Sequence, residues 1–220
     1  MIRIGIFDTG IGGVLFAKEL RKHNPEYSIK VVHDRENLPY GDKSEKDIRD
    51  LVDKAIQPIL LADIIVIACN TATAYAIDHL RKKYPEKTFV GFEPAIKIAA
   101  TQTKTKCIAV LATPATLKSE RYRILKSAYG MNTTIFEPQV KTLASQIETR
   151  KIDWKSLEAL LHNLKLQHVD IIVLGCTHYH LIQNSIQQLV GSEVTVITPT
   201  QSVIDRIDKL TARKVGSPRF

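Results

Sequence analysis

Two cysteines could do chemistry, because each follows an apolar run of nearly the same sequence. Cys69 ends the stretch Asp63-Ile-Ile-Val-Ile-Ala-Cys69, and Cys176 ends the stretch Asp170-Ile-Ile-Val-Leu-Gly-Cys176. A continuous run rich in β-branched residues is typical of a parallel strand that is covered on both faces. Ligands bind at the carboxyl ends of such strands, so both thiols occupy positions suited to chemistry.

Two thiols in equivalent positions suit the removal of a proton from one face of a carbon and its return on the other face. One cysteine must then be a thiolate and the other a thiol when each turnover starts. Cys69 precedes a helical pattern, and the helix dipole is expected to lower the pKa of this thiol below its usual value of about 8.5. Asp8, at a glycine-rich turn, and His178 are the side chains expected to assist Cys69 and Cys176.

The repeat that carries the two cysteines extends along the chain. Three pairs of equivalent residues have nearly the same separation: Cys69 and Cys176 (176 − 69 = 107), Thr9 and Thr113 (113 − 9 = 104), and Pro94 and Pro199 (199 − 94 = 105). The pattern predicts an α/β fold with two similar, pseudo-symmetric α/β domains, parallel-type sheets and the active site in the cleft between them. We expect a first α/β domain at 1–95, a second at 96–198, and a C-terminal helix and tail at 199–220 that pack back on the first domain.

Local patterns predict several further elements. A helix is expected around Leu143 to Glu148, and another from Leu181 to Val190. Apolar residues at helical spacing predict a helix from Trp154 to Leu166, with Trp154 itself in the core. The segment from Thr211 to Phe220 lacks this spacing and is expected to be a frayed tail.

Composition favours an ordinary globular protein. The chain has 220 residues, of which 44% are hydrophobic and 25% charged, and its net charge is +8. The basic residues are scattered and have no aromatic residues between them, which argues against nucleic-acid binding. Three cysteines without a signal-peptide pattern indicate free thiols, and no apolar run reaches the roughly 20 residues of a membrane span. We therefore expect a cytoplasmic protein that binds neither nucleic acid nor membrane.

Five motifs together resemble those of the cofactor-independent aspartate/glutamate racemases. They are Phe7-Asp-Thr-Gly-Ile-Gly-Gly13, Pro39-Tyr-Gly-Asp-Lys-Ser44, Ala68-Cys-Asn-Thr-Ala72, Gly91-Phe-Glu-Pro94 and Gly175-Cys-Thr-His-Tyr179. The Cys-Thr-His sequence is similar to that of the glutamate branch of the family. The resemblance implies an isomerase that interconverts L- and D-glutamate by two-cysteine proton transfer and supplies D-glutamate for peptidoglycan. It implies no cofactor and no metal.

The same resemblance implies which residues form the site. The catalytic residues would be Cys69 and Cys176, assisted by Asp8 and His178. Glu148 is matched to a family glutamate near the second cysteine. The implied contacts to the amino-acid substrate come from a larger set: Asp8, Thr9, Tyr40, Gly41, Asn70, Thr71, Thr113, Thr116, Thr177 and His178.

Other interpretations stay open at this point. Thr9, Phe92, His180 and Thr198 depart from the residues usual in the family, so aspartate or another amino acid is an alternative substrate. A Cys-His hydrolase with Cys176 as the nucleophile is a second alternative. A non-catalytic anion-binding protein is a third. Assembly as a homodimer is also left open.

Overall fold

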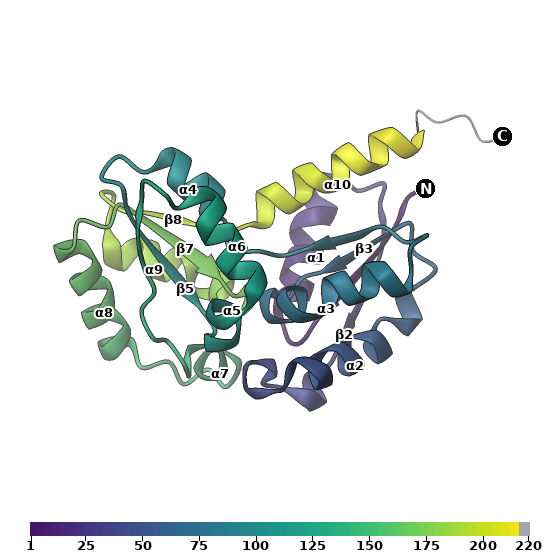
Figure 1. Cartoon of the computed structure of the whole chain (residues 1–220), viewed down its shortest axis with the longest axis horizontal. Helices are drawn as coiled ribbons and strands as arrows, with labels where there is room; N and C mark the ends of the chain where they lie inside the picture. The colour runs from purple at the N-terminus through teal and green to yellow at the C-terminus, as the bar shows by residue number, and fades with distance from the viewer. Residues whose placement is uncertain (216–220) are drawn as a thin grey trace. The chain divides into compact units, whose positions relative to one another are not determined.

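The computed structural model describes residues 1–215, and their side chains as far as residue 212. The described chain divides into two compact units. The first contains residues 1–38, 44–92 and the chain from Pro199, and the second contains residues 39–43 and 93–198. Each unit has a four-stranded parallel sheet with helices packed on it, which confirms the predicted fold class (Figure 1).

The sheet of the first unit has the strand order β2-β1-β3-β4, and all its neighbouring strands are parallel. Its main elements, in chain order, are β1 (Arg3–Asp8), α1 (Gly12–His23), β2 (Ser28–His33), α2 (Glu45–Ala55), β3 (Ile64–Ile67), α3 (Asn70–Lys83), β4 (Phe89–Gly91) and α10 (Thr200–Val215). Short 3-10 turns lie at Arg35–Asn37 and Gln57–Ile59.

The sheet of the second unit repeats this order as β6-β5-β7-β8, again parallel throughout. Its elements are η2 (Tyr40–Asp42), α4 (Ile96–Gln102), β5 (Cys107–Ala112), α5 (Pro114–Lys118), α6 (Glu120–Tyr129), β6 (Thr134–Phe136), α7 (Leu143–Glu148), α8 (Trp154–Leu166), β7 (Ile171–Gly175), η4 (Thr177–Ile182), α9 (Gln183–Val190) and β8 (Thr195–Ile197). The equal strand order explains why the sequence repeats.

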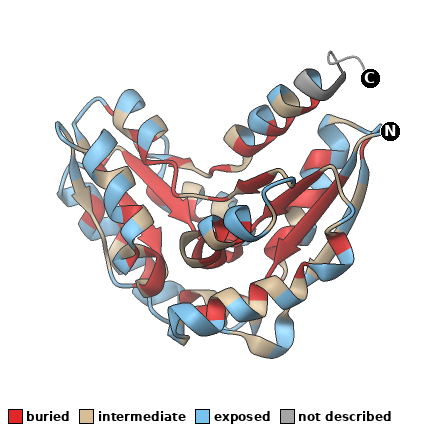
Figure 2. Ribbon diagram, turned by 45° about the vertical axis from the view of Figure 1, so that its right-hand side comes forward, coloured by how far each residue is buried: buried red, intermediate tan, exposed pale blue. Residues whose placement is uncertain are grey.

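The central strands are apolar throughout because both faces of each sheet are covered. In β7, Ile172 and Leu174 pack in one cluster with residues of α8 and α9, whereas Ile171 and Val173 pack in a second cluster with residues of α4. Alternate residues of a strand point to opposite faces, so a strand covered twice needs no polar positions. Figure 2 shows the strands as buried and the outer faces of the helices as exposed.

A carboxylate before each of the strands β3 and β7 holds the neighbouring chain. Asp63 accepts hydrogen bonds from the backbone N–H of Arg3 at 2.9 Å and from its guanidinium at 3.3 Å. Asp170, at the equivalent position of the repeat, accepts from the loop before β5: Thr103 Oγ1 at 2.6 Å, Lys104 N at 2.6 Å and Thr105 N at 3.1 Å. These bonds position the starts of the central strands.

The edge strand β8 is closed by side chains of α9. Gln187 accepts a hydrogen bond from the backbone N–H of Val196 at 3.0 Å and donates to the Val194 carbonyl at 2.8 Å. Gln183 donates to the Val196 carbonyl at 3.1 Å. Both backbone polar groups of Val196 are therefore paired on the side away from β7.

Several local expectations differ from the structure. Trp154 begins α8 and is 41% exposed, so it is not in the core. The expected helix from Leu181 starts at Gln183, because a 3-10 turn precedes it. The expected tail from Thr211 is wrong in its first part, since α10 continues to Val215, and its remainder at 216–220 lies outside the described residues. No helix in residues 1–215 is both long and apolar enough to cross a membrane.

Candidate active site

Strand order determines where side chains gather in each unit. In the order β2-β1-β3-β4 the chain reverses its direction across the sheet between β1 and β3, and in β6-β5-β7-β8 it does so between β5 and β7. Ligands of open α/β sheets bind at the carboxyl ends of the strands beside such a reversal. Asp8 ends β1 and Cys69 follows β3, whereas Thr113 follows β5 and Cys176 follows β7. The first thiol site consists of Asp8, Thr9, Cys69, Asn70 and Thr71; the second is built around Cys176.

Cys69 is the N-cap residue of α3, as the sequence predicts. Its Sγ accepts a hydrogen bond from the backbone N–H of Ala72 at 3.5 Å and one from Thr9 Oγ1 at 3.5 Å. Asp8 is fully buried, and its Oδ2 accepts from the N–H groups of Gly10 at 3.1 Å and Gly13 at 3.0 Å. The glycine-rich turn thus wraps the carboxylate of Asp8.

The expected low pKa of Cys69 is wrong. Burial, together with the smaller effect of the negative charge of Asp8, raises the pKa of this thiol to about 12, although the N–H groups of α3 and the Thr9 hydroxyl act in the opposite direction. The helix dipole contributes only a modest stabilisation of a charge, whereas removing a thiolate from water is costly. In this site Cys69 is therefore a thiol at neutral pH.

Asn70 and Thr71 form the first turn of α3 and are each 3% exposed. Neither Nδ2 nor Oδ1 of Asn70 has a hydrogen-bond partner among the described residues. A buried amide without partners is costly in a folded protein, unless a ligand or water satisfies it. The Asn70 side chain is therefore a strong candidate for a ligand contact.

The second thiol site contains a chain of three ionisable side chains. Cys176 Sγ lies 3.8 Å from His178 Nδ1, and His178 Nε2 lies 3.0 Å from Glu148 Oε2. Cys176 and His178 are 7% and 5% exposed, and Glu148 comes from the end of α7, which packs on η4. A carboxylate at this position orients the imidazole and stabilises its protonated form. We define the second thiol site as Cys176, Thr177, His178 and Glu148.

Hydroxyl groups from α5 and the η2 turn belong to the same unit. Thr113 caps α5: its Oγ1 accepts from the Thr116 N–H at 3.2 Å and lies 2.9 Å from Thr116 Oγ1. Tyr40 is 2% exposed, and a Cβ built on Gly41 would lie 3.8 Å from Thr113 Cβ. The η2 turn packs on α5 even though it comes from the first half of the sequence. Sequence periodicity did not predict that residues 39–43 belong to the second unit.

His180, one of the departures from the family pattern, lies beside the second thiol site. Burial, together with a smaller effect of His178, lowers the pKa of its ring to about 4, while a hydrogen bond with the Leu174 backbone acts in the opposite direction. His180 is therefore neutral at physiological pH. It contributes packing and a backbone hydrogen bond, and no charge.

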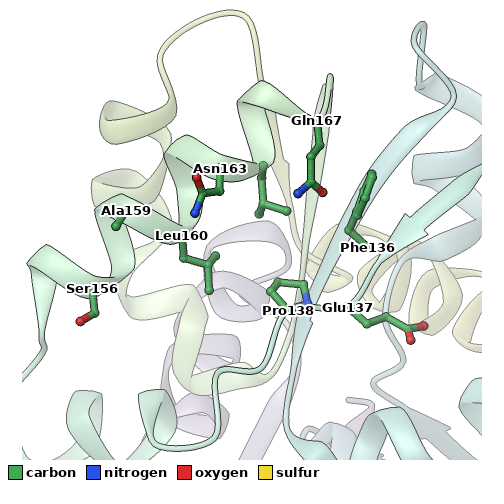
Figure 3. Close-up of a pocket in the computed structure, with 9 residues that line it drawn as sticks. Phe136, Glu137, Pro138, Ser156, Ala159, Leu160, Asn163 and Gln167 are labelled. Atoms are coloured by element: carbon green, nitrogen blue, oxygen red, sulfur yellow. The ribbon is translucent and has the colours of Figure 1, made fainter.

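A surface cavity of about 610 Å³ lies elsewhere in the second unit, between α8 and the chain around the end of β6 (Figure 3). Its lining residues are Phe136, Glu137, Pro138, Ser156, Ala159, Leu160, Asn163, Leu164 and Gln167. No residue of either thiol site lines it. The cavity is therefore a separate feature of the second unit and adds no group to the thiol chemistry.

Comparisons with known proteins agree with the motifs. The family model described as Asp/Glu/Hydantoin racemase matches residues 15–207. Glutamate racemase of Sulfurovum sp. is 36% identical over 222 residues, covering 97% of this chain and 84% of that protein, and that of Aliarcobacter butzleri is 35% identical over 223 residues, covering 97% and 85%.

Solved structures give the same result. The crystal structure of Escherichia coli glutamate racemase in complex with L-glutamate and the activator UDP-MurNAc-ala matches with a TM-score of 0.86 at 27% identity, covering 96% of this chain and 82% of that chain. Glutamate racemase from Francisella tularensis in complex with D-glutamate matches with a TM-score of 0.80 at 26% identity, covering 100% and 84%. The sequence motifs, the paired parallel sheets and a family match over most of the chain lead to one conclusion: the chain belongs to the Asp/Glu/hydantoin racemase family.

Proposed function

We propose that this enzyme interconverts L- and D-glutamate by moving the α-proton between two cysteines. One observation carries the proposal: each unit has a buried cysteine at the carboxyl end of a central strand, with an ionisable partner from its own unit. Cys69 has Asp8, and Cys176 has His178 at 3.8 Å. The relatives at 35–36% identity, all named glutamate racemase, support glutamate as the substrate.

In the proposed mechanism both thiol sites bind the same substrate molecule. One cysteine, as a thiolate, removes the α-proton and becomes a thiol, and the other, as a thiol, gives its proton to the opposite face of the carbon and becomes a thiolate. No proton is gained or lost in a turnover. Removing the α-proton places negative charge on the substrate carboxylate, and hydrogen-bond donors aimed at that charge lower the barrier.

The first turn of α3 supplies such donors. The backbone N–H groups at the start of this 14-residue helix favour an anion, and the buried amide of Asn70 has no partner among the described residues. We assign one substrate carboxylate to Asn70, Thr71 and the turn after Asp8. Tyr40, Gly41, Thr113, Thr116, Thr177 and His178 are the contacts proposed on the second unit.

Activity is tested by incubating the purified protein, without added cofactor, with each enantiomer of glutamate and following circular dichroism. The signal should decay to zero from both sides, because the equilibrium mixture is racemic. The Cys107→Ser variant is the matched control, since Cys107 starts β5 and packs on the core. A constant signal with glutamate, together with decay with aspartate, would change the assigned substrate.

In a bacterial source, the proposed role is the supply of D-glutamate for peptidoglycan in the cytoplasm. This role predicts that the gene restores growth of a bacterial strain that requires external D-glutamate. The Cys69→Ser variant should not restore growth. Growth supported by that variant would show that the effect on growth does not depend on the proposed chemistry of Cys69.

A Cys-His hydrolase is a second candidate, because Cys176, His178 and Glu148 form the thiol-imidazole-carboxylate series of such enzymes. This alternative gives Cys69 no function. It predicts a burst of product from an activated ester that is lost in Cys176→Ser and kept in Cys69→Ser. Loss of glutamate racemisation in both variants supports the racemase.

A further inference from the structure

The repeat places a hydrogen-bonding side chain four residues after each of the two cysteines. Thr73 follows Cys69 and His180 follows Cys176 by this distance. Thr73 and His180 are as far apart in the chain as the cysteines are (180 − 73 = 107). They therefore occupy equivalent positions of the two units, although their side chains have different chemistry.

Thr73 closes the turn that carries Cys69. Its Oγ1 donates a hydrogen bond to the carbonyl of Ile67, the last residue of β3, at 3.0 Å, and accepts one from the N–H of Phe92, just after β4, at 3.2 Å. Its backbone N–H donates to the Cys69 carbonyl at 2.8 Å. Thr73 is 1% exposed, so its hydroxyl is satisfied by these protein groups. Cys69 thus lies inside a loop that is closed from both of its ends.

His180 makes the equivalent contact in the second unit. Burial is the main cause of the low pKa of its ring, whereas a hydrogen bond with the Leu174 backbone raises the pKa. A backbone group raises the pKa of an imidazole by accepting a hydrogen bond, so a ring N–H donates to the Leu174 carbonyl. Leu174 lies two residues before Cys176, as Ile67 lies two residues before Cys69. The η4 turn that carries His180 packs on β7, which contains Leu174.

The two turns have different geometry, which explains the two different side chains. In α3 the Thr73 N–H bonds to a carbonyl four residues back, whereas in η4 the Tyr179 N–H bonds to the Cys176 carbonyl three residues back, at 3.0 Å. A 3-10 turn rises about 2.0 Å per residue and an α-helix about 1.5 Å, so four residues span about 8 Å in η4 and about 6 Å in α3. A threonine hydroxyl reaches the strand end from α3, and a longer imidazole reaches it from η4.

We propose that Thr73 and His180 are the positioning residues of the two thiols, each joining the turn after its cysteine to the strand before it. We call this contact the strand clamp. The inference rests on the proposed function and extends it, because it assigns residues that act through Cys69 and Cys176. Proton transfer between sulfur and the α-carbon requires precise placement, and small displacements of a reacting group lower the rate strongly. A loop that is closed by a hydrogen bond has fewer alternative positions.

The test follows each thiol separately, by iodoacetamide alkylation and peptide mass spectrometry in a Cys107→Ser background that leaves two cysteines. Cys69 and Cys176 are each 7% exposed, so the reagent reaches them through local opening. His180→Leu removes the donor and keeps a side chain of similar size. It should accelerate alkylation of Cys176 about two- to tenfold, the effect of one hydrogen bond, and leave Cys69 unchanged. Thr73→Val should accelerate Cys69 and leave Cys176 unchanged.

Conservative variants separate the hydrogen bond from the shape of the side chain. Thr73→Ser keeps the hydroxyl, and His180→Asn and His180→Gln place an amide N–H near one or the other ring nitrogen. Thr73→Ser and at least one of the two amide variants should keep the alkylation rates of the unmodified enzyme. An unchanged Cys176 rate in His180→Leu would overturn the proposal. An equal rise at both cysteines would also overturn it, because that pattern is a general loosening of the chain.

Racemisation kinetics give a second readout. In His180→Leu and in Thr73→Val, kcat should fall about two- to tenfold while KM is unchanged, because the clamps hold the thiols and not the substrate. A raised KM with an unchanged kcat would contradict this assignment. If the unmodified enzyme does not racemise glutamate, the proposed function fails, whereas intact racemisation without the crossed alkylation pattern rejects the strand clamps alone.

A measurement on the unmodified enzyme remains decisive even if His180→Leu does not fold. Nitrogen NMR should show a neutral His180 ring with one N–H that exchanges slowly with water, assigned through the carbons of its own side chain. Slow exchange is expected because this proton is bonded to the Leu174 carbonyl. Rapid exchange of this proton beside slowly exchanging amides of β7 would show that the clamp does not form, and would overturn the proposal.

Discussion

Replacement of Glu148 by glutamine tests the second thiol site most sharply. Glu148 Oε2 lies 3.0 Å from His178 Nε2, and the side chains of His178 and Glu148 are 6% and 27% exposed. Glutamine has nearly the same shape and keeps an oxygen that can accept the same hydrogen bond. The variant therefore removes the negative charge behind the imidazole and changes little else.

The size of the effect follows from the strength of the bond. A hydrogen bond to a charged group contributes about 1.5–3 kcal/mol, and each 1.4 kcal/mol corresponds to a factor of ten in rate. Because 27% of the Glu148 side chain is exposed, water screens part of its charge, and the lower end of that range applies. We expect kcat/KM to fall about tenfold.

The assay is racemisation of L- and of D-glutamate, followed by circular dichroism. The equilibrium constant of a racemisation is 1, so kcat/KM must fall by the same factor in both directions, which provides an internal check. Glu158→Gln, on the exposed side of α8, is the matched control and should retain full activity. A fully active Glu148→Gln enzyme with an unchanged melting temperature would refute the role assigned to Glu148.

Three further predictions address the thiols, the substrate contacts and stability. Cys69→Ser and Cys176→Ser should each abolish racemisation, yet in heavy water each should wash deuterium mainly into one enantiomer; racemisation surviving both substitutions would exclude the two-thiol mechanism. Thr71→Val should raise KM roughly two- to tenfold, because one hydroxyl hydrogen bond contributes about 0.5–1.5 kcal/mol, whereas an unchanged KM would limit Thr71 to shaping its helix. Burial by itself raises the pKa of Asp170, but the hydrogen bonds to its carboxylate lower the pKa below the usual value. The stability that these bonds add is therefore present above about pH 4 and is lost as the pH falls through the lowered pKa. Asp170→Asn should thus reduce the free energy of unfolding in urea by about 1–2 kcal/mol at neutral pH, and the difference should shrink in acid.

Local patterns predicted many elements because they depend on nearby residues. The bounds of α7 and α8 agree with the sequence prediction. The exposed position of Trp154 was missed because helical spacing does not reveal where the covering elements end.

The site was less predictable where it depends on tertiary packing. The sequence placed Cys69 correctly at a helix N-terminus and still gave the wrong direction for its pKa shift. The burial of Cys69 and its closeness to the charge of Asp8 arise only when β1 and β3 pair. Glu148 lies thirty positions before His178, so only the packing of α7 on η4 brings them together. The unpaired amide of Asn70 is likewise a property of the folded structure.

The hydrogen bonds between α9 and β8 also limit how this protein can associate with itself. An exposed edge strand offers free N–H and C=O groups to which another chain can add a strand, and this is a common route to aggregation. β8 is three residues long, and only Val196 directs its backbone groups away from β7; Gln183 and Gln187 occupy both of them. An incoming strand would first have to displace the two part-buried amide side chains that hold Val196. Association of two chains by strand addition at β8 is therefore disfavoured.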